Sequence, residues 1–406
     1  MAASPSEEMP FQFDELFFSR TDTAGIIRSG NSVFQRVSGF EWDELIGKPH
    51  KVVRHPDMPR AVFFTLWDFI KRGEPVGAYV KNRTKDGRHY WVFAVVTPIE
   101  GGFLSVRLKP SSELFVVAQR EYEALRAQEL AEDLSAAESA ERLYARLQSL
   151  GYDSYQDFMA DAIAQEIIAR DAKLARVVDR RIPVFKDVLA HSKGLLSQAA
   201  TVAAGYGKNE RVSLNFQVQA AKLGDAGVVT GQISKNYDLI CSQINASLAN
   251  FAAAAEDVLA TVHSGLFLTC TALIQSEVLE LFRREASLAD SHGEEIPKLE
   301  GQMLAYQTHA IEGLSSITDQ ALVFRRRCED MKRMAGALEV TRIMGMVECA
   351  RQKTVGESLT ELLTELESLQ ATVSGGLQQI DRLNQRIAYA TESLLSQSRW
   401  LLSRAA

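Results

Sequence analysis

The stretch VGAYVKNRTKDGRHYWVFAVVTPI (residues 76–99) holds two strand-forming segments on either side of a tight turn. Val, Tyr, Phe and Trp fill both segments, and these residues favour pleated strands. Between them, KDG (85–87) supplies the residues of a hairpin turn. GGFLSVRL (101–108) follows as a further strand. We therefore expect three consecutive antiparallel strands between residues 76 and 108.

Shorter elements precede this hairpin. GIIRSGN (25–31) predicts a brief strand, and EWDELIG (41–47) predicts a short helix that ends at a glycine. AVFFTLWDFIKRG (61–73) predicts an amphipathic helix with a glycine just after its last turn. Strands and short helices in this order indicate a small α+β sensor-like domain over residues 1–112.

The rest of the chain has a different composition. Eight of the ten prolines lie in the first 110 residues, and Ala, Leu, Glu, Gln and Arg dominate after Leu114. These are strong helix formers, whereas proline interrupts helices. We expect 121–151 to form one long helix inside a helical connector (113–181). Residues 182–406 are expected to form a mostly α domain, a long-helix bundle or coiled coil.

Charge and cysteine spacing exclude several classes of protein. The net charge is −7 with no long basic block, which argues against nucleic-acid binding. The cysteines have no CxxC spacing, so we expect free thiols and no zinc site at Cys241, Cys270, Cys328 and Cys349.

Hydropathy indicates a cytoplasmic protein with no membrane span. The N-terminus has neither the charged region nor the apolar core of a signal peptide. The most apolar later stretch, VLATVHSGLFLTCTALIQ (258–275), is short and contains His263 and several hydroxyls. A buried helix fits it better than a membrane span.

No motif of an enzyme is present. The sequence has no P-loop, GxGxxG, HExxH, nucleophile–base constellation, or phosphoacceptor histidine with an ATP-binding domain. We therefore expect a protein that is not an enzyme.

Several N-terminal motifs occur together in a fixed order: Asn31, SGFEWDELIGKPH (38–50), RHPDMP (54–59), a helix with Phe63 and Trp67, VKNRTKDGRHYW (80–91) and TPI (97–99). Over about a hundred residues they resemble the PAS domain of bacterial aerotaxis receptors. The resemblance implies a PAS fold that binds FAD noncovalently and responds to its redox state. The family's flavin-binding positions match here at Asn31, Arg54, His55, Asp57, Phe63 and Asn82, while Val76 replaces a family tryptophan.

The residue types agree with such a site. Trp67 and Trp91 offer aromatic faces to a ring, Arg54 and His55 can compensate negative charge, and Asn82 has both amide functions. The predicted cofactor site is thus Asn31, Arg54, His55, Asp57, Phe63, Trp67, Asn82 and Trp91.

Two alternatives to FAD stay open. One is haem, with His55 or His89 as axial ligand. The other is no cofactor, with Arg54 pairing with Asp57 across the loop. Light-driven flavin–cysteine chemistry is excluded, since this domain contains no cysteine.

A second motif lies in the helical part. In VSLNFQVQAAKLGDAGVVTGQISKNY (212–237), eight residues match one pattern: Leu214, Asn215, Val218, Ala220, Ala221, Gly224, Asp225 and Gly227. The stretch resembles the hairpin tip of methyl-accepting chemotaxis receptors, with departures at Gln219, Lys222 and Leu223. This resemblance implies the chemotaxis histidine kinase and its coupling protein as partners. The contact would involve Leu214, Asn215, Val218, Gln219 and Lys222.

A weak internal repeat accompanies the tip motif. VQAAK (218–222) returns as VECAR (347–351), 129 residues later. We hypothesise two tandem hairpins that build a four-helix bundle within one chain, a pseudo-dimeric monomer; a homodimer is the alternative. The paired Glu/Gln sites of adaptive methylation are not visible, and the Glu-Glu pairs at 7–8 and 294–295 are expected in loops.

The leading functional hypothesis is a soluble cytoplasmic redox or oxygen sensor. It would transmit the state of a PAS-bound flavin to a helical signalling domain that binds chemotaxis proteins. The alternative is a cofactor-free PAS and helical scaffold or interaction protein outside chemotaxis.

Overall fold

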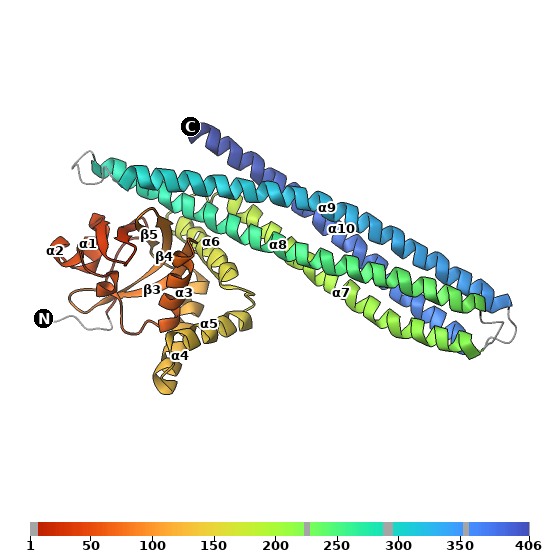
Figure 1. Ribbon diagram of the computed structural model, residues 1–406. Helices are drawn as coiled ribbons and strands as arrows, with labels where there is room; N and C mark the ends of the chain where they lie inside the picture. The colour runs from red at the N-terminus through yellow and green to blue at the C-terminus, as the bar shows by residue number, and fades with distance from the viewer. Residues whose placement is uncertain (1–6, 223–227, 287–294, 352–356, 406) are drawn as a thin grey trace. The chain divides into compact units, whose positions relative to one another are not determined.

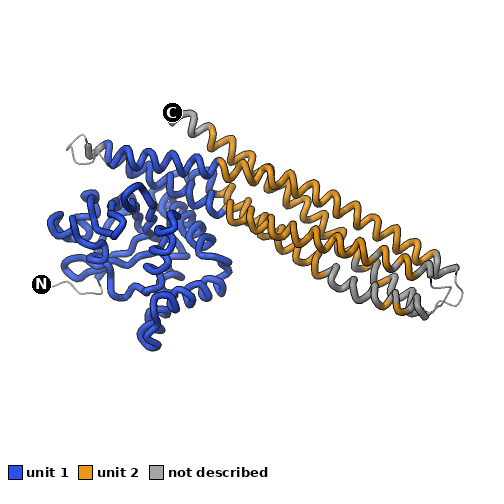
Figure 2. The backbone as a smooth tube through the Cα atoms, viewed as in Figure 1, with its two compact units in different colours: residues 1–182, 263–311 blue, residues 183–262, 312–406 orange. Residues whose placement is uncertain are grey.

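A computed structural model describes residues 7–222, 228–286, 295–351 and 357–405 of the chain. The chain forms two compact units (Figure 2). Unit 1 consists of residues 1–182 and 263–311, and unit 2 consists of residues 183–262 and 312–406. The expected division into a sensor domain (1–112), a helical connector (113–181) and a helical bundle (182–406) remains a prediction.

Unit 1 contains a five-stranded antiparallel sheet with strand order β2-β1-β5-β4-β3. Its strands are β1 (Phe17–Asp22), β2 (Ile27–Gly30), β3 (Val76–Arg83), β4 (His89–Ile99) and β5 (Gly102–Leu108). The expected hairpin is confirmed: Asn82 pairs with Tyr90, and Gly87 takes a positive φ of 97° in the turn. The sequence analysis did not predict β1. Its sequence, FFSRTD, contains polar residues, and these make polar contacts on both faces of the strand.

Helices lie on both sides of this sheet. Those before β3 are α1 (Ser32–Ser38), α2 (Trp42–Leu45), a 3-10 turn (His50–Val53) and α3 (Arg60–Lys71). Those after β5 are α4 (Glu113–Glu132), α5 (Ala136–Ser149) and α6 (Tyr155–Lys173), as Figure 1 shows. The expected α+β architecture followed by long helices is confirmed.

The single long helix expected over 121–151 was wrong. Asp133 takes a left-handed conformation (φ 49°) and ends α4. Ser135 then caps α5, accepting from the Glu138 backbone N–H while the Glu138 side chain accepts from the Ser135 N–H. This capping box was legible in the sequence as Ser-x-x-Glu.

The sheet face that carries Phe18, Tyr79 and Thr97 packs on helices. Tyr155 of α6 donates to the Gly77 carbonyl at 3.0 Å. Parts of α8 (Val228–Ala286) and α9 (Glu295–Arg351) also belong to unit 1. Phe282 of α8 meets Phe18 edge-on at 4.9 Å between ring centroids, and Gln302 of α9 is 2.7 Å from the Thr97 hydroxyl.

Glu166 fastens α6 and the start of α4 to this face. Its carboxylate accepts from Tyr79 OH at 2.8 Å, Ser112 Oγ at 2.5 Å and the Ser111 N–H at 2.6 Å. Burial raises the pKa of Glu166. Several donors satisfy the buried carboxylate, so it joins β3 to both helices.

Unit 2 consists of α7 (Arg181–Lys222), much of α8 and α9, and α10 (Glu357–Ala405). The apolar stripe expected as core in α10 is buried at Leu377, Ile380, Ile387 and Leu394. The two segments of the sequence repeat, 218–222 and 347–351, lie in α7 and α9. The tandem duplication itself stays a hypothesis.

One helix among the described residues, Gly231–Arg283, is long and apolar enough to cross a membrane. However, 72% of its most apolar window is buried inside the protein. The core helices of soluble proteins often pass the same test of length and composition. The stretch 258–275 lies in this helix and includes the buried residues Val262, Leu266 and Cys270.

We predict opposite effects for two neighbouring glycines of α10. A Cβ added at Gly376 would overlap with Val202 Cγ2 of α7, whereas one at Gly375 would meet nothing within 4 Å. Because valine is stiff in helices, Gly376→Ala should lower the free energy of unfolding by about 1–3 kcal/mol. Gly375→Ala should raise it by about 0.5–1 kcal/mol through helix propensity. Urea unfolding followed by circular dichroism measures both, and equal effects would contradict the close approach of α7 and α10.

Candidate ligand-binding cavity

A cavity of about 800 Å³ lies between the sheet and α3. Its sheet wall consists of alternate residues, which face the same side of a strand: Ser19, Thr21, Val80, Asn82, Ala94, Val96, Phe103, Ser105 and Arg107. Its helical wall comes from Phe63, Leu66, Trp67 and Ile70 of α3. These four recur at the spacing of one helix face.

Four of the eight predicted cofactor residues line this cavity: Arg54, Phe63, Trp67 and Asn82. The Arg54 guanidinium lies 3.8 Å from the centroid of the Phe63 ring, a stacked cation–π contact. Asn82 on β3 is only 4% exposed, and its backbone bridges to that of Arg54. The RHPD loop and β3 are thereby held together at the cavity wall.

His55 and Asp57 do not line the cavity. Lys81 Nζ donates to Asp57 Oδ2 at 2.7 Å, and this hydrogen bond holds the pKa of Asp57 below its usual value. His55 Nδ1 accepts from the Asp57 N–H at 3.2 Å. The pairing expected between Arg54 and Asp57 in the cofactor-free alternative is replaced by Asp57–Lys81. Neither His55 nor His89, the suggested haem ligands, is part of the lining.

Asn31 and Trp91 also lie outside the lining. Asn31 caps α1 by accepting from the Phe34 N–H at 3.2 Å, and it bonds the backbone of β1 through the Phe18 N–H at 3.0 Å. Trp91 meets the ring of Phe115 of α4 edge-on, 5.4 Å between centroids. A cofactor role for these residues stays a prediction.

The sequence analysis assigned no role to Arg107 or to His50. Arg107 Nη2 donates to Ser19 Oγ at 2.6 Å and to His50 Nε2 at 2.7 Å. Since a guanidinium can only donate, Nε2 must be the acceptor and His50 is neutral. Burial, and then the Arg107 charge, lower the pKa of His50 to about 3. The alternation Phe103, Ser105, Arg107 in β5 was the available signal.

The lining carries more positive than negative charge. Lys51, Arg54, Arg60 and Lys71 contribute to it, together with the carboxylate of Asp68. Lys51 and Lys71 are exposed, so these cations lie toward solvent. Such a rim suits an anionic group such as a phosphate.

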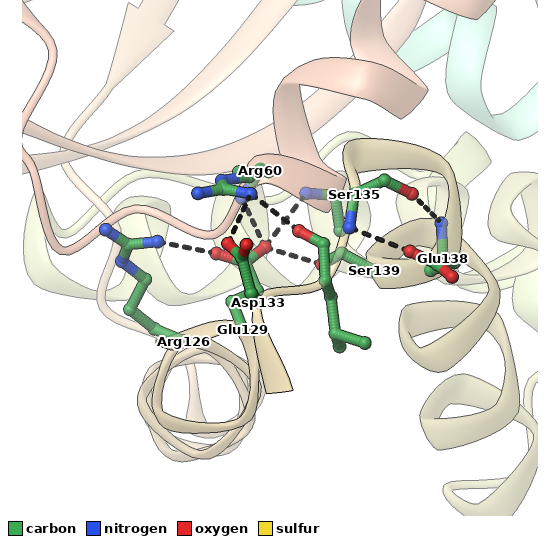
Figure 3. Close-up of polar contacts among 9 residues, drawn as sticks. Arg60, Arg126, Glu129, Asp133, Ser135, Glu138 and Ser139 are labelled. Carbon is green, nitrogen blue, oxygen red and sulfur yellow. Dashed lines mark hydrogen bonds and ion pairs between the residues drawn. The ribbon is translucent and has the colours of Figure 1, made fainter. Parts of the chain in front are cut away.

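Helix α3 is fixed at its first turn by Glu129 of α4, as Figure 3 shows. The Glu129 carboxylate is fully buried and accepts from the Arg60 N–H at 2.5 Å, Ser139 Oγ at 2.5 Å and Arg126 Nη1 at 2.9 Å. A carboxylate at a helix N-terminus satisfies free N–H groups and complements the helix dipole. The cavity wall with Phe63 and Trp67 is therefore anchored to α4 and α5.

We predict that His50 makes the protein sensitive to acid. Because its folded pKa of about 3 lies below the ordinary 6.5, the unfolded chain takes up the proton first as pH falls. The free energy of unfolding is then fully retained above pH 6.5 and falls below it, by ~1 kcal/mol per pH unit. His50→Gln keeps an acceptor for Arg107 but does not titrate, so it should remove this part of the slope. Urea unfolding between pH 4 and 7 compares the two proteins, and identical slopes would refute the prediction.

Comparison with known proteins relates the N-terminal part of the chain to a known family. Residues 28–106 match the family described as PAS fold. The aerotaxis receptor of Escherichia coli is 41% identical over 126 residues, 30% of this chain and 25% of the receptor. The biofilm dispersion protein BdlA of Pseudomonas aeruginosa is 28% identical over 106 residues, 25% of each chain. The matches thus span about a quarter of the length of either relative.

Among solved structures, the light-state structure of the blue-light photoreceptor Aureochrome1 LOV aligns with 26% of this chain and 88% of its own. The sequence identity is 18% and the TM-score is 0.24. These family and sequence matches confirm the expected resemblance to the PAS domain of aerotaxis receptors: residues 28–106 are a PAS domain, and 126 residues of this chain are homologous to part of the aerotaxis receptor.

Proposed function

We propose that this protein is a cytoplasmic redox or oxygen sensor that binds FAD in the PAS cavity and signals through its long helices to chemotaxis proteins. The observation that carries the proposal is the cavity of about 800 Å³, found in a PAS domain homologous to part of an aerotaxis receptor. Ligand cavities of this size hold cofactors in many proteins.

The lining fits a flavin nucleotide. Phe63 and Trp67 offer aromatic surface to a planar ring, and Asn82 can both donate to and accept from its edge. Arg54 and Arg60 suit the phosphates at the rim. A flavin would supply a redox-active ring whose charge changes on reduction.

β1 offers a route from the cavity to α9. Ser19 faces the cavity and bonds Arg107, while the next residue, Arg20, faces the other side of the sheet. There Arg20 Nε lies 2.8 and 2.9 Å from the two carboxylate oxygens of Glu295, which also accepts from Ser29 Oγ at 2.8 Å. Glu295 was expected in a loop but is a buried residue and the first described residue of α9. A shift of β1 would act directly on the start of that helix.

Exposed side chains in unit 2 support a partner-binding role. Of the five predicted contact residues, all on α7, Asn215 and Val218 are exposed. The side chains of Leu214, Gln219 and Lys222 lie outside the described residues. On α9, four exposed apolar residues follow a one-face spacing: Val340, Ile343, Met344 and Val347. Exposed apolar stripes often mark protein contacts, here proposed for the chemotaxis kinase and its coupling protein.

Two tryptophans that were both predicted to bind the cofactor give a matched test. Trp67 lines the cavity and Trp91 packs on α4, so Trp67→Leu should weaken FAD binding at least about 10-fold, whereas Trp91→Leu should bind as wild type does. Titration of the refolded or flavin-stripped full-length protein with FAD, monitored by flavin fluorescence, measures both, with circular dichroism to verify folding. A wild-type protein that is colourless and takes up no FAD would favour the scaffold hypothesis instead.

A further inference from the structure

Arg107 is a buried cation whose charge is not balanced by a carboxylate among the described residues. Arg107 is 4% exposed, and its side chain hydrogen-bonds the neutral groups of Ser19 and His50. Its Nη1 atom is buried and has no hydrogen-bond partner in the described structure. Arg107 belongs to the cavity lining as a residue, and its Nη1 atom is buried.

The other buried arginines of the described chain are each within ion-pair distance of a carboxylate. Arg170 is fully buried and donates from Nη1 and Nη2 to the two oxygens of Glu277, both at 2.8 Å. Arg181 pairs with Asp179 at 2.8 Å, and Arg342 lies 3.4 Å from a Glu367 oxygen. The contrast singles out Arg107, because leaving a buried charge unpaired is costly.

A second polar group beside Arg107 also lacks a partner. Ser105 lies two residues earlier on β5 and lines the same cavity, and its buried Oγ has no hydrogen-bond partner in the described structure. Residues two apart on a strand point to the same face. Arg107 Nη1 and Ser105 Oγ are therefore two buried, unpaired donors on residues of the cavity side of the sheet.

We propose that Arg107, with Ser105, binds the electron-rich edge of the cavity's ligand: a planar heterocycle with a carbonyl oxygen beside a ring nitrogen. This deepens the flavin proposal above and rests on it. The ligand then enters with its heterocycle toward Arg107 and leaves its phosphates at the rim, near the exposed Lys51 and Lys71. The bound edge supplies the acceptor that the protein itself does not provide.

The test compares Arg107→Met with Lys71→Met in the full-length protein, with and without FAD. Both variants remove one positive charge from the lining, but Lys71 is exposed and its charge is screened by water. Without ligand, Arg107→Met should raise the unfolding temperature by about 3 °C or more, because a buried unpaired charge is removed. With FAD, it should bind at least about 10-fold more weakly than wild type. Lys71→Met should change the unfolding temperature little, and it should weaken FAD binding less than Arg107→Met does, because Lys71 lies at the exposed rim proposed for the phosphates.

Two results would overturn the proposal. One is an Arg107→Met protein that is less stable than wild type without ligand, which would make Arg107 a structural residue. The other is unchanged FAD affinity in Arg107→Met. Arg107→Lys serves as a fold-preserving second variant, and it should retain more FAD affinity than Arg107→Met.

Failure of the flavin proposal itself looks different. If the wild-type protein takes up no FAD, that proposal falls. The ligand-free comparison still decides on Arg107, since a rise in unfolding temperature supports an uncompensated charge and a fall contradicts it.

Discussion

The alternation of side chains along β1 is the constraint on which the rest of unit 1 depends. Ser19 points into the cavity and bonds Arg107, and Arg20 points to the opposite face and pairs with Glu295 at the start of α9. Because adjacent residues of a strand face opposite sides, one strand contacts both the cavity and a long helix. A shift of β1 caused on the cavity face can then reach the helix on the other face without any change in the sheet's topology.

The two faces of the sheet differ in how their polar groups are satisfied. On the helix-covered face, the Glu166 carboxylate receives several donors and Thr97 bonds Gln302, so these two groups are satisfied within the protein. On the cavity face, Arg107 Nη1 and Ser105 Oγ are left without partners in the described structure. Buried polar groups are almost always hydrogen-bonded in native proteins. The unpaired donors on the cavity side suit a ligand, and the paired groups on the helix-covered side suit the transmission of a response.

Local sequence signals predicted the elements that depend on local chemistry. The hairpin around Gly87 and helix α3 follow from turn residues and amphipathic spacing, and both are confirmed. The break between α4 and α5 was missed although its capping box was readable at Ser135, because helix propensity outweighed the cap in our interpretation.

β1 was missed because its polar residues are explained only by distant partners. The alternation in β5 could have placed Arg107 on the cavity side, but only the folded chain reveals that none of its described neighbours is a carboxylate paired with it. Conversely, Asn31 and Trp91 have types suited to a cofactor, yet they lie outside the cavity lining.

The central claim is that the ligand state of the cavity reaches α9 through β1. Amide hydrogen exchange of the full-length protein, with and without saturating FAD, tests it most directly. The account predicts altered exchange both in the cavity-lining segments and in β1 and the first turns of α9 after Glu295, with the second effect abolished in Glu295→Gln. Exchange that changes only in the cavity-lining segments, with β1 and α9 unaffected, would contradict it.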